Sequence, residues 1–366
     1  MLTLHDTTED IKKLALGGAI IAGAVIIIMI VFRIGVSVFN AVNPPKVAPP
    51  TVEFGKLPPM SFPKSVTDEK LTYVNNTISG TLPEFPDRLP VYPIHQDKGT
   101  LLNLDQAKSG VSAVGFVVDP VSSDAAQLQL SATDYRWTVS RDLAKTITMN
   151  IVSKNFVYTS DYLNYPPVLS AAYLPNENDS VQAVMGFLSQ IGANTGDIDE
   201  TKTKETLFAI QNGILVPAIT IGSAQVVRVD LFQGNVDGKP IVYQSPATSP
   251  MNALVASGLY TGQVVEAHYF HQGYDKNSAS TYPIISASAA LSELKNGKAF
   301  IVSFNGTTTQ VLIGKIYLAY YMSDEPQQYL EPVVVFEGDN DFVAYLPAID
   351  YGRTDAILRG PSAPPK

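Results

Sequence analysis

The longest apolar run in the chain lies near its N-terminus, where Leu14 to Phe32 comprises nineteen residues without a charged side chain. A helix of that length spans about 28 Å, which is close to the hydrocarbon thickness of a bilayer. We therefore predict a transmembrane anchor over residues 14–38, preceded by a cytoplasmic tail over residues 1–13. A cleaved signal peptide is the alternative, but its apolar core would be shorter and a small-residue cleavage site would follow it.

The orientation of this segment depends on the basic residues that flank it, because cytoplasmic flanks carry an excess of Lys and Arg. Lys12 and Lys13 precede the run and Arg33 and Lys46 follow it, so the two sides nearly balance. We expect the N-terminus inside, because the long segment after the run would cross the membrane largely regardless of its charge. The prediction is a single-pass cell-membrane protein with the bulk of the chain extracytoplasmic.

Small residues within the run recur at spacing four, at Ala15, Ala19 and Gly23. This spacing lets a second helix approach closely, and it is compatible with a membrane partner or a homo-oligomer. The alternative interpretation is that small residues are simply common in membrane helices.

Helical periodicity appears three times in the rest of the chain. In each case a polar capping residue comes first, apolar residues then line one face, and a glycine follows. The capping residues and terminating glycines are Asn103 and Gly115, Asp179 or Ser180 and Gly192, and Ser286 and Gly297. We predict one helix within each of these three segments.

Strand-like alternation of apolar and polar residues follows each predicted helix. The predicted strands cover residues 135–139, 146–152, 226–232, 241–243, 264–270, 315–321, 332–336 and 342–346. A helix that packs across an antiparallel sheet makes an α+β domain. We predict repeated helix-plus-antiparallel-sheet units at residues 65–175, 176–278 and 279–350. The alternative is one irregular β-rich domain with three helices.

Proline-rich segments flank the predicted units. Seven prolines within residues 43–64 exclude a helix and favour an extended, semi-rigid stalk between the membrane and the first unit. The C-terminal residues 351–366, which contain Pro361, Pro364 and Pro365, are predicted to be disordered.

Composition narrows the classes of function. The chain has no cysteine, which excludes disulfides, thiol catalysis and cysteine-ligated metals. Its net charge of −9 belongs to the part after the apolar run, because the charges before Asn40 cancel. An acidic domain argues against nucleic acid as a partner, since binding to the phosphate backbone requires basic patches.

The sequence contains no recognisable motif for catalysis or cofactor binding. G-x-S-x-G and G-x-G-x-x-G do not occur, and Gly234–Lys239 lacks the spacing of a phosphate loop. His268 and His271 lie three residues apart in a predicted strand, so they face opposite sides and do not share a metal. The acidic residues at 197–200 and 337–341 lack the other EF-hand ligands, which leaves calcium as a weak alternative. We assign no catalytic, cofactor-binding or metal-ligating residue and predict that the protein is not an enzyme.

The third predicted unit resembles a known family. The segment Tyr282–Ile284, the helix end at residues 294–298, the strand Ile316–Tyr321 and the run Gln328–Gly338 look like the closing module of YycH/YycI-like proteins. The resemblance covers residues 280–347 well and the remainder in outline. It implies one N-terminal membrane helix, extracytoplasmic helix-plus-sheet units akin to PepSY modules, and a regulatory action on a sensor histidine kinase. The family carries no catalytic residues.

The first functional hypothesis is therefore a non-enzymatic, membrane-anchored extracytoplasmic protein that binds and regulates another envelope protein, such as a sensor kinase. The alternative is a structural or ligand-binding cell-envelope protein without a signalling role. A carboxylate-dependent hydrolase is the third hypothesis, and it predicts two acids with raised pKa values that converge in a concave pocket.

Overall fold

The computed structural model describes residues 50–359, except for residues 96–97, 118–124, 141–142, 172–176 and 260–262, and it also describes Met29 and Arg33. The chain divides into two compact units, residues 1–49 and residues 50–366. Apart from Met29 and Arg33, which are helical, the predicted tail and anchor lie outside the described residues. Among the residues described, no helix has the length and apolar character needed to cross a membrane. The anchor, its orientation and its small-residue contact stay predictions.

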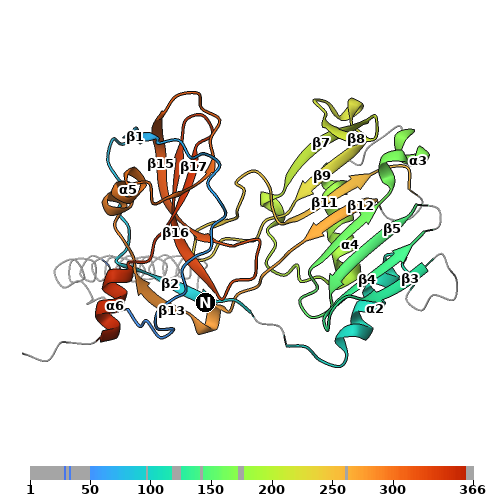
Figure 1. Ribbon diagram of the computed structural model, residues 1–366, viewed down its shortest axis with the longest axis horizontal. Helices are drawn as coiled ribbons and strands as arrows, with labels where there is room; N and C mark the ends of the chain where they lie inside the picture. Colours follow the sequence, from blue (N-terminus) through green and yellow to red (C-terminus); the bar gives the residue numbers. More distant parts are fainter. Residues whose placement is uncertain are drawn as a thin grey trace, which may run out of the picture. The chain divides into compact units, whose positions relative to one another are not determined.

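The described part of residues 50–366 has a mixed α+β fold that is rich in sheet and has few helices (Figure 1). The larger sheet has nine strands in the order β3-β4-β5-β6-β12-β11-β9-β7-β8, and all neighbouring strands are antiparallel. Its strands are β3 (Ala125–Gln129), β4 (Asp134–Val139), β5 (Lys145–Asn150), β6 (Phe156–Ser160), β7 (Lys204–Gln211), β8 (Ile214–Pro217), β9 (Val226–Asp230), β11 (Met251–Ala256) and β12 (Val264–Tyr269).

The second sheet has eight strands, with the path β1-β15-β16-β17-β14. Strand β10 pairs with β15, and β2 pairs with both β13 and β16. Strands β1 and β10 run parallel to β15, whereas the other pairs are antiparallel. The strands are β1 (Thr72–Asn75), β2 (Arg88–Pro93), β10 (Ile241–Val242), β13 (Ser280–Pro283), β14 (Phe300–Ser303), β15 (Gln310–Tyr321), β16 (Tyr329–Gly338) and β17 (Val343–Pro347).

Helices α2 (Asn103–Ala113) and α4 (Glu177–Ile191) pack against each other on one face of the nine-stranded sheet (Figure 1). Apolar residues of both helices share one core with the inward-facing residues of the strands, among them Leu188 and Met149. Full burial of each such side chain stabilises the fold by about 1.5–3 kcal/mol.

Gly110 allows α2 and α4 to approach closely. A Cβ atom at this position would lie 2.3 Å from the carbonyl oxygen of Ile191, a distance that no side chain tolerates. A glycine weakens a helix interior, but here it permits contact between the two helix backbones. The close contact holds the C-terminal end of α4, which Gly192 terminates with a φ of +79°.

The three predicted helices are all present. Helix α5 (Ala287–Lys295) begins as expected, because the Ser286 side chain accepts a hydrogen bond from the Ala289 amide. Helix α4 begins at Glu177, slightly before the predicted cap at Asp179 or Ser180. All the predicted strands are also present, with small differences at their ends.

The pairing of the strands does not follow the boundaries of the three predicted units. Strands β1 and β2 come from residues 65–175, yet they pair with strands of the C-terminal part of the chain. Strands β3 to β6 instead join β12 and continue into one sheet with the strands of residues 176–278. The cause is long-range hydrogen bonding between strand edges, which local periodicity does not encode.

The prediction of an extended stalk over residues 43–64 is wrong for residues 51–62, which we call the strap. The Val52 amide donates to the Thr281 carbonyl, and both Val52 and Leu57 are buried. Phe54 stacks on Tyr329 with ring centroids 5.0 Å apart. The strap therefore packs on the eight-stranded sheet. Burial removes its apolar side chains from water, whereas an extended stalk would leave them exposed.

The prediction that residues 351–366 are disordered is wrong for residues 351–359. They form helix α6 (Tyr351–Arg359), in which Thr354 is buried and Arg353 pairs with Asp87 at 2.7 Å. The helix is capped, since the Asp350 carboxylate accepts a hydrogen bond from the Arg353 amide. The proline-containing residues 360–366 lie outside the described residues.

Candidate functional site

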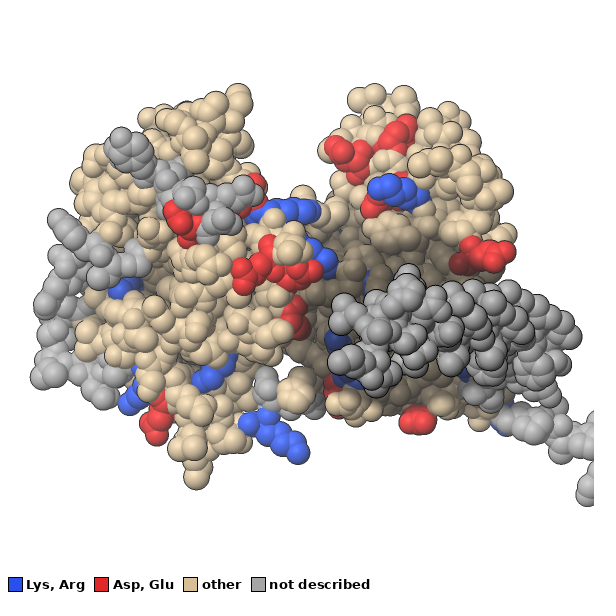
Figure 2. Space-filling view, turned by 180° about the vertical axis from the view of Figure 1, so that it is seen from behind, with Lys and Arg blue, Asp and Glu red and all other residues tan. Residues whose placement is uncertain are grey.

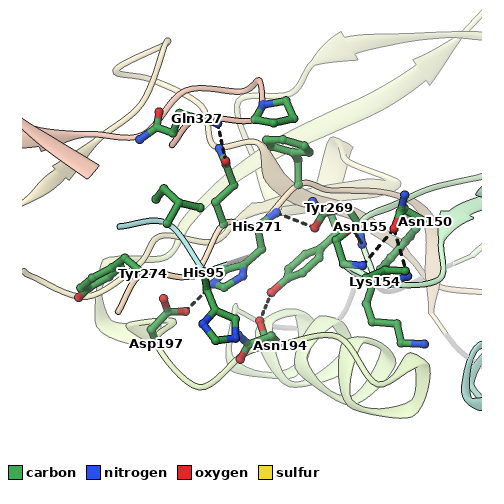
Figure 3. A pocket seen from close by; sticks show the side chains of 18 of the residues that line it. His95, Asn150, Lys154, Asn155, Asn194, Asp197, Tyr269, His271, Tyr274 and Gln327 are labelled. Atoms are coloured by element: carbon green, nitrogen blue, oxygen red, sulfur yellow. Dashed lines mark hydrogen bonds and ion pairs between the residues drawn. The ribbon is translucent and has the colours of Figure 1, made fainter. Parts of the chain in front are cut away.

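A large pocket opens at one end of the nine-stranded sheet (Figure 3). Its volume is about 1290 Å³. The walls come from the turn between β5 and β6, from residues 268–277 at the end of β12, and from residues 192–197 after α4. Ile94 and His95, Thr133 and Asp134, and Pro326 and Gln327 also line the pocket. Segments far apart in the sequence therefore meet at this one place.

A hydrogen-bonded pair of one buried and one partly buried side chain forms the floor of the pocket. The Nε2 atom of His271 lies 2.7 Å from Oδ1 of Asp197, and the side chain of His271 is 4% exposed. Gln233 Nε2 donates to Asp197 Oδ2 at 2.8 Å and to the carbonyl of Gln272 at 3.1 Å. Both carboxylate oxygens of Asp197 are thus occupied by partners that belong to other segments.

These contacts set the protonation state of Asp197. Burial alone would raise its pKa, but the hydrogen bonds from His271 and Gln233 outweigh burial and hold the pKa of Asp197 below its ordinary value. The carboxylate is therefore ionised at neutral pH and only accepts hydrogen bonds. It follows that Nε2 of His271 carries the hydrogen in this contact.

The strand alternation of β12 positions His271. Tyr269 ends the strand, and His271 lies two residues further on the same side, where the two rings stack with an interplanar angle of 10°. The Tyr269 hydroxyl donates to the Asn194 carbonyl, and the His271 amide donates to Asn155 Oδ1 at 3.0 Å. His268, by contrast, is exposed. The prediction that the two histidines face opposite sides is confirmed.

Gln272 connects the pocket to the loop after β15. Its Nε2 atom donates to the carbonyls of Ser323 and Glu325, at 2.9 and 3.0 Å, and its Oε1 accepts from the Gln327 amide at 3.0 Å. Three hydrogen bonds from one buried side chain fix the backbone of this loop. The floor of the pocket is therefore preorganised.

The rim of the pocket is polar and mixed in charge. The side chains of the rim include amides, two lysines and one aromatic ring on which a ligand can stack. They are Asn150, Lys154, Asn155, Asn194, Tyr274, Lys276 and Asn277. Lys276 Nζ lies 5.5 Å from the centre of the Tyr274 ring. On the molecular face of Figure 2, acidic and basic side chains are scattered over a larger uncharged area. Such a rim offers hydrogen bonds rather than a strong field of one sign.

Three titratable side chains of the pocket, Asp197, His271 and Asp275, are held in hydrogen bonds with neighbouring residues. In the described part of the chain, the acceptor that faces His271 Nε2 is Asp197 Oδ1, and no hydroxyl group is recorded as a partner of the ring. The described residues also contain no group of three or more His, Asp or Glu side chains that suits a metal ion. Hydrogen bonds from Ser278 and Asn277 lower the pKa of Asp275, as contacts also do for Asp197. The hydrolase hypothesis predicted two converging acids with raised pKa values; these two acids have lowered values, whereas the pKa of Glu331, in another pocket, is raised to about 8.

The sequence singled out two members of the floor separately. His271 was weighed as a metal ligand with His268, and Asp197 was weighed with a calcium loop. The separation of 74 positions between Asp197 and His271 concealed their pairing. Gln233 carried no signal at all, because a lone glutamine after a strand matches no motif.

Comparisons with known proteins identify no family. No protein-family model matches the chain, and no curated protein matches its sequence. Among solved structures, an uncharacterized protein from Eubacterium rectale ATCC 33656 has a TM-score of 0.42 and 11% identity, over 78% of this chain and 90% of that chain. The Bacillus megaterium YpeB C-terminal domain has a TM-score of 0.30 and 11% identity, over 70% of this chain and 96% of that domain. Likenesses this distant carry no argument, so the YycH/YycI and PepSY resemblance stays a prediction.

Proposed function

We propose that this chain is a membrane-anchored, extracytoplasmic protein that binds another envelope protein without catalysis. The observation that carries the proposal is the large pocket, in which buried hydrogen bonds hold a rigid floor beneath a polar rim. A concave site of this kind binds a polar segment, because amide side chains both donate and accept hydrogen bonds.

The rigidity of the floor supports a role in recognition. Asp197, His271 and Gln233 are occupied with one another, so they shape the pocket rather than react with its contents. A preformed floor reduces the entropy that is lost on binding. Specificity then falls to rim side chains such as Asn277 and Lys276, which are exposed.

A regulatory action on a sensor kinase is the finer part of the proposal. It rests on the predicted anchor at residues 14–38 and on the resemblance of residues 280–347 to YycH/YycI-like proteins. A partner bound in the pocket would be held near the membrane, where a kinase of the same membrane would be within reach.

The second candidate function is ligand binding in the cell envelope without signalling. The observation that favours it is the size of the pocket, because about 1290 Å³ exceeds what a single side chain needs. Its ligand would be a wall polymer or a peptide with many hydrogen-bonding groups.

The test is crosslinking of the full-length chain in its native host, followed by identification of the attached molecule. Asn277→Trp places a bulky ring at the pocket rim and removes no side-chain hydrogen bond recorded for Asn277. Thr307→Trp, in an exposed loop of the other sheet, is the matched control. We expect one membrane protein to be recovered with wild type and Thr307→Trp and lost with Asn277→Trp.

Two other results would change the proposal. Recovery of the same protein from Asn277→Trp would move binding away from the pocket. Recovery of wall polymer in place of a protein would favour the second candidate. Exchange of residues 14–38 for an unrelated apolar helix separates the contribution of the predicted anchor from that of the pocket.

A further inference from the structure

A second, smaller site centres on Glu331 in β16. This glutamate is only 3% exposed, and its Oε2 atom is buried without a hydrogen-bond partner in the described part of the chain. No ion pair involving Glu331 is present among the described residues either. Buried carboxyl groups without a partner are rare, because their removal from water costs several kcal/mol.

The carboxyl group borders a pocket of about 230 Å³. Tyr321 and Glu331 are opposite each other in the β15–β16 ladder, so their side chains lie on the same face of the sheet. The strap covers this face with residues 58–61, and Tyr329 and Ser323 complete the inner wall. The Tyr321 hydroxyl is also buried without a hydrogen-bond partner among the described residues.

The lining indicates the charge of an occupant. Of the described residues around the pocket, two are acidic, Glu331 at the base and the exposed Glu325 at the rim, and none is Lys, Arg or His. The remaining wall contains apolar side chains, namely Pro58, Pro59, Met60 and Pro326. Metal ions prefer more oxygen ligands than one buried carboxylate, and no such cluster occurs in the described residues. An organic cation with an apolar stem matches both features.

We propose that this pocket binds the alkylammonium group of a lysine side chain from a partner protein. The methylene stem would lie against the prolines and Met60, as long basic side chains do on apolar surfaces. The ammonium group would donate to the Glu331 carboxylate and to the Tyr321 hydroxyl, the two described pocket-lining groups with a buried atom that lacks a partner. The inference does not depend on the larger pocket or on the function proposed for it.

Ionisation of Glu331 controls the site. Burial raises the pKa of Glu331 to about 8, so the empty site is mostly neutral at pH 6.5 and mostly charged at pH 8.5. The other titratable groups that line the pocket or interact electrostatically with Glu331 are Glu325, Tyr282, Tyr321, Tyr329 and Tyr351. None of them is cationic. Lysine binding must therefore release a proton from Glu331 at low pH, and affinity rises with pH.

The experiment measures binding of two probes to the full-length chain by saturation-transfer NMR and equilibrium dialysis. Nα-acetyl-L-lysine amide carries the ammonium group, and Nα-acetyl-L-norleucine amide has a similar stem without it. We expect the lysine probe to bind at least tenfold more tightly than the norleucine probe at pH 8.5. Its affinity should fall at least tenfold from pH 8.5 to pH 6.5.

Two variants assign the site. Glu331→Gln removes the charge with little change of shape and should weaken the lysine probe at least tenfold. Glu84→Gln, at an exposed position outside the pocket lining, should leave the affinity within about twofold, because an exposed charge contributes little. If Glu331→Gln does not fold, the comparison of the two probes and the pH dependence on wild type still decide the matter.

Equal binding of the two probes would overturn the inference, and so would lysine binding that survives Glu331→Gln. Binding of n-butylammonium without binding of the lysine probe would also overturn it, since a side chain attached to a backbone would then not reach the carboxylate. Failure of the larger pocket to bind a partner would leave these results unaffected.

Discussion

Each of the two sheets has a carboxylate that is withdrawn from water, partly for Asp197 and almost fully for Glu331, and the two are in opposite situations. Asp197, beside the nine-stranded sheet, receives hydrogen bonds from His271 and Gln233 on both of its oxygens. Glu331, in the eight-stranded sheet, has none for its Oε2 atom. Loss of water raises the pKa of both acids, yet the net effect is a lowered pKa for Asp197 and a pKa raised to about 8 for Glu331. Hydrogen-bond partners, together with depth, decide whether an acid withdrawn from water is charged.

The difference separates a structural role from a binding role. A satisfied carboxylate holds loops in place and leaves nothing for a ligand. An unsatisfied carboxylate destabilises the fold at high pH, where it is ionised. We expect such a destabilising group at a site where a bound ligand supplies the missing hydrogen bonds. Measurements of unfolding free energy against pH test this difference between the two carboxylates.

The largest expected effect concerns Glu331→Gln. The folded pKa of Glu331 is raised from 4.5 to about 8, so wild type loses stability as pH rises through this interval. We expect wild type to lose roughly 2–5 kcal/mol more unfolding free energy between pH 5 and pH 9 than the variant does. Urea denaturation at each pH measures it. Parallel pH curves for the two proteins would mean that Glu331 finds a partner in solution.

The next effect concerns His271→Phe, which keeps an aromatic ring beside Tyr269 and removes the hydrogen bond to Asp197. A partly buried carboxylate that loses a partner destabilises the fold by about 1–3 kcal/mol. Thermal unfolding at pH 7 measures this change. A variant as stable as wild type would show that the charged pair does not hold the pocket floor.

A smaller effect is expected for Asp197→Asn. Because the folded pKa of Asp197 is lowered, its stabilisation is present at neutral pH and is lost as pH falls through that pKa. The variant should be less stable than wild type by about 1 kcal/mol at pH 7, and the difference should shrink below about pH 4. Denaturation curves at pH 7 and pH 3 are the check. A difference that grows in acid would contradict the assignment.

The smallest expected effect on stability belongs to Asn277→Trp, at an exposed rim position. The unfolding free energy should change by no more than about 0.5 kcal/mol, as for other surface substitutions. Loss of the crosslinked partner without loss of stability would then assign the defect to the pocket. A large fall in thermal stability would instead remove this variant as a test of binding.

Local sequence pattern predicted much of the fold. The alternation of Ile147 and Met149 gave a strand with those residues inside, and the Ser286 cap began α5 as expected. The strap and α6 were missed for related reasons. Prolines exclude a helix but do not prevent packing, and the prolines near the end of the chain lie beyond α6.

The candidate site was much less predictable. His271 and Asp197 each drew notice as possible metal ligands, but nothing in the sequence joined them to each other or to Gln233. Glu331 lies in a segment whose pattern predicts a strand. No local sequence pattern indicates that a buried carboxylate lacks a hydrogen-bond partner. The reason is that a site is made by residues that tertiary contacts bring together.

The sequence by itself determined three of the helices and eight of the strands in the described part of the chain, because glycine stops and apolar periodicity act within a few residues of chain. It also determined the absence of disulfides, since there is no cysteine. Only the tertiary structure decided that β1 pairs with β15, that the strap covers Glu331, and that Asp197 meets His271. Those contacts depend on which strand edges and apolar faces meet across long separations, and the free energy of that choice is shared by the whole fold.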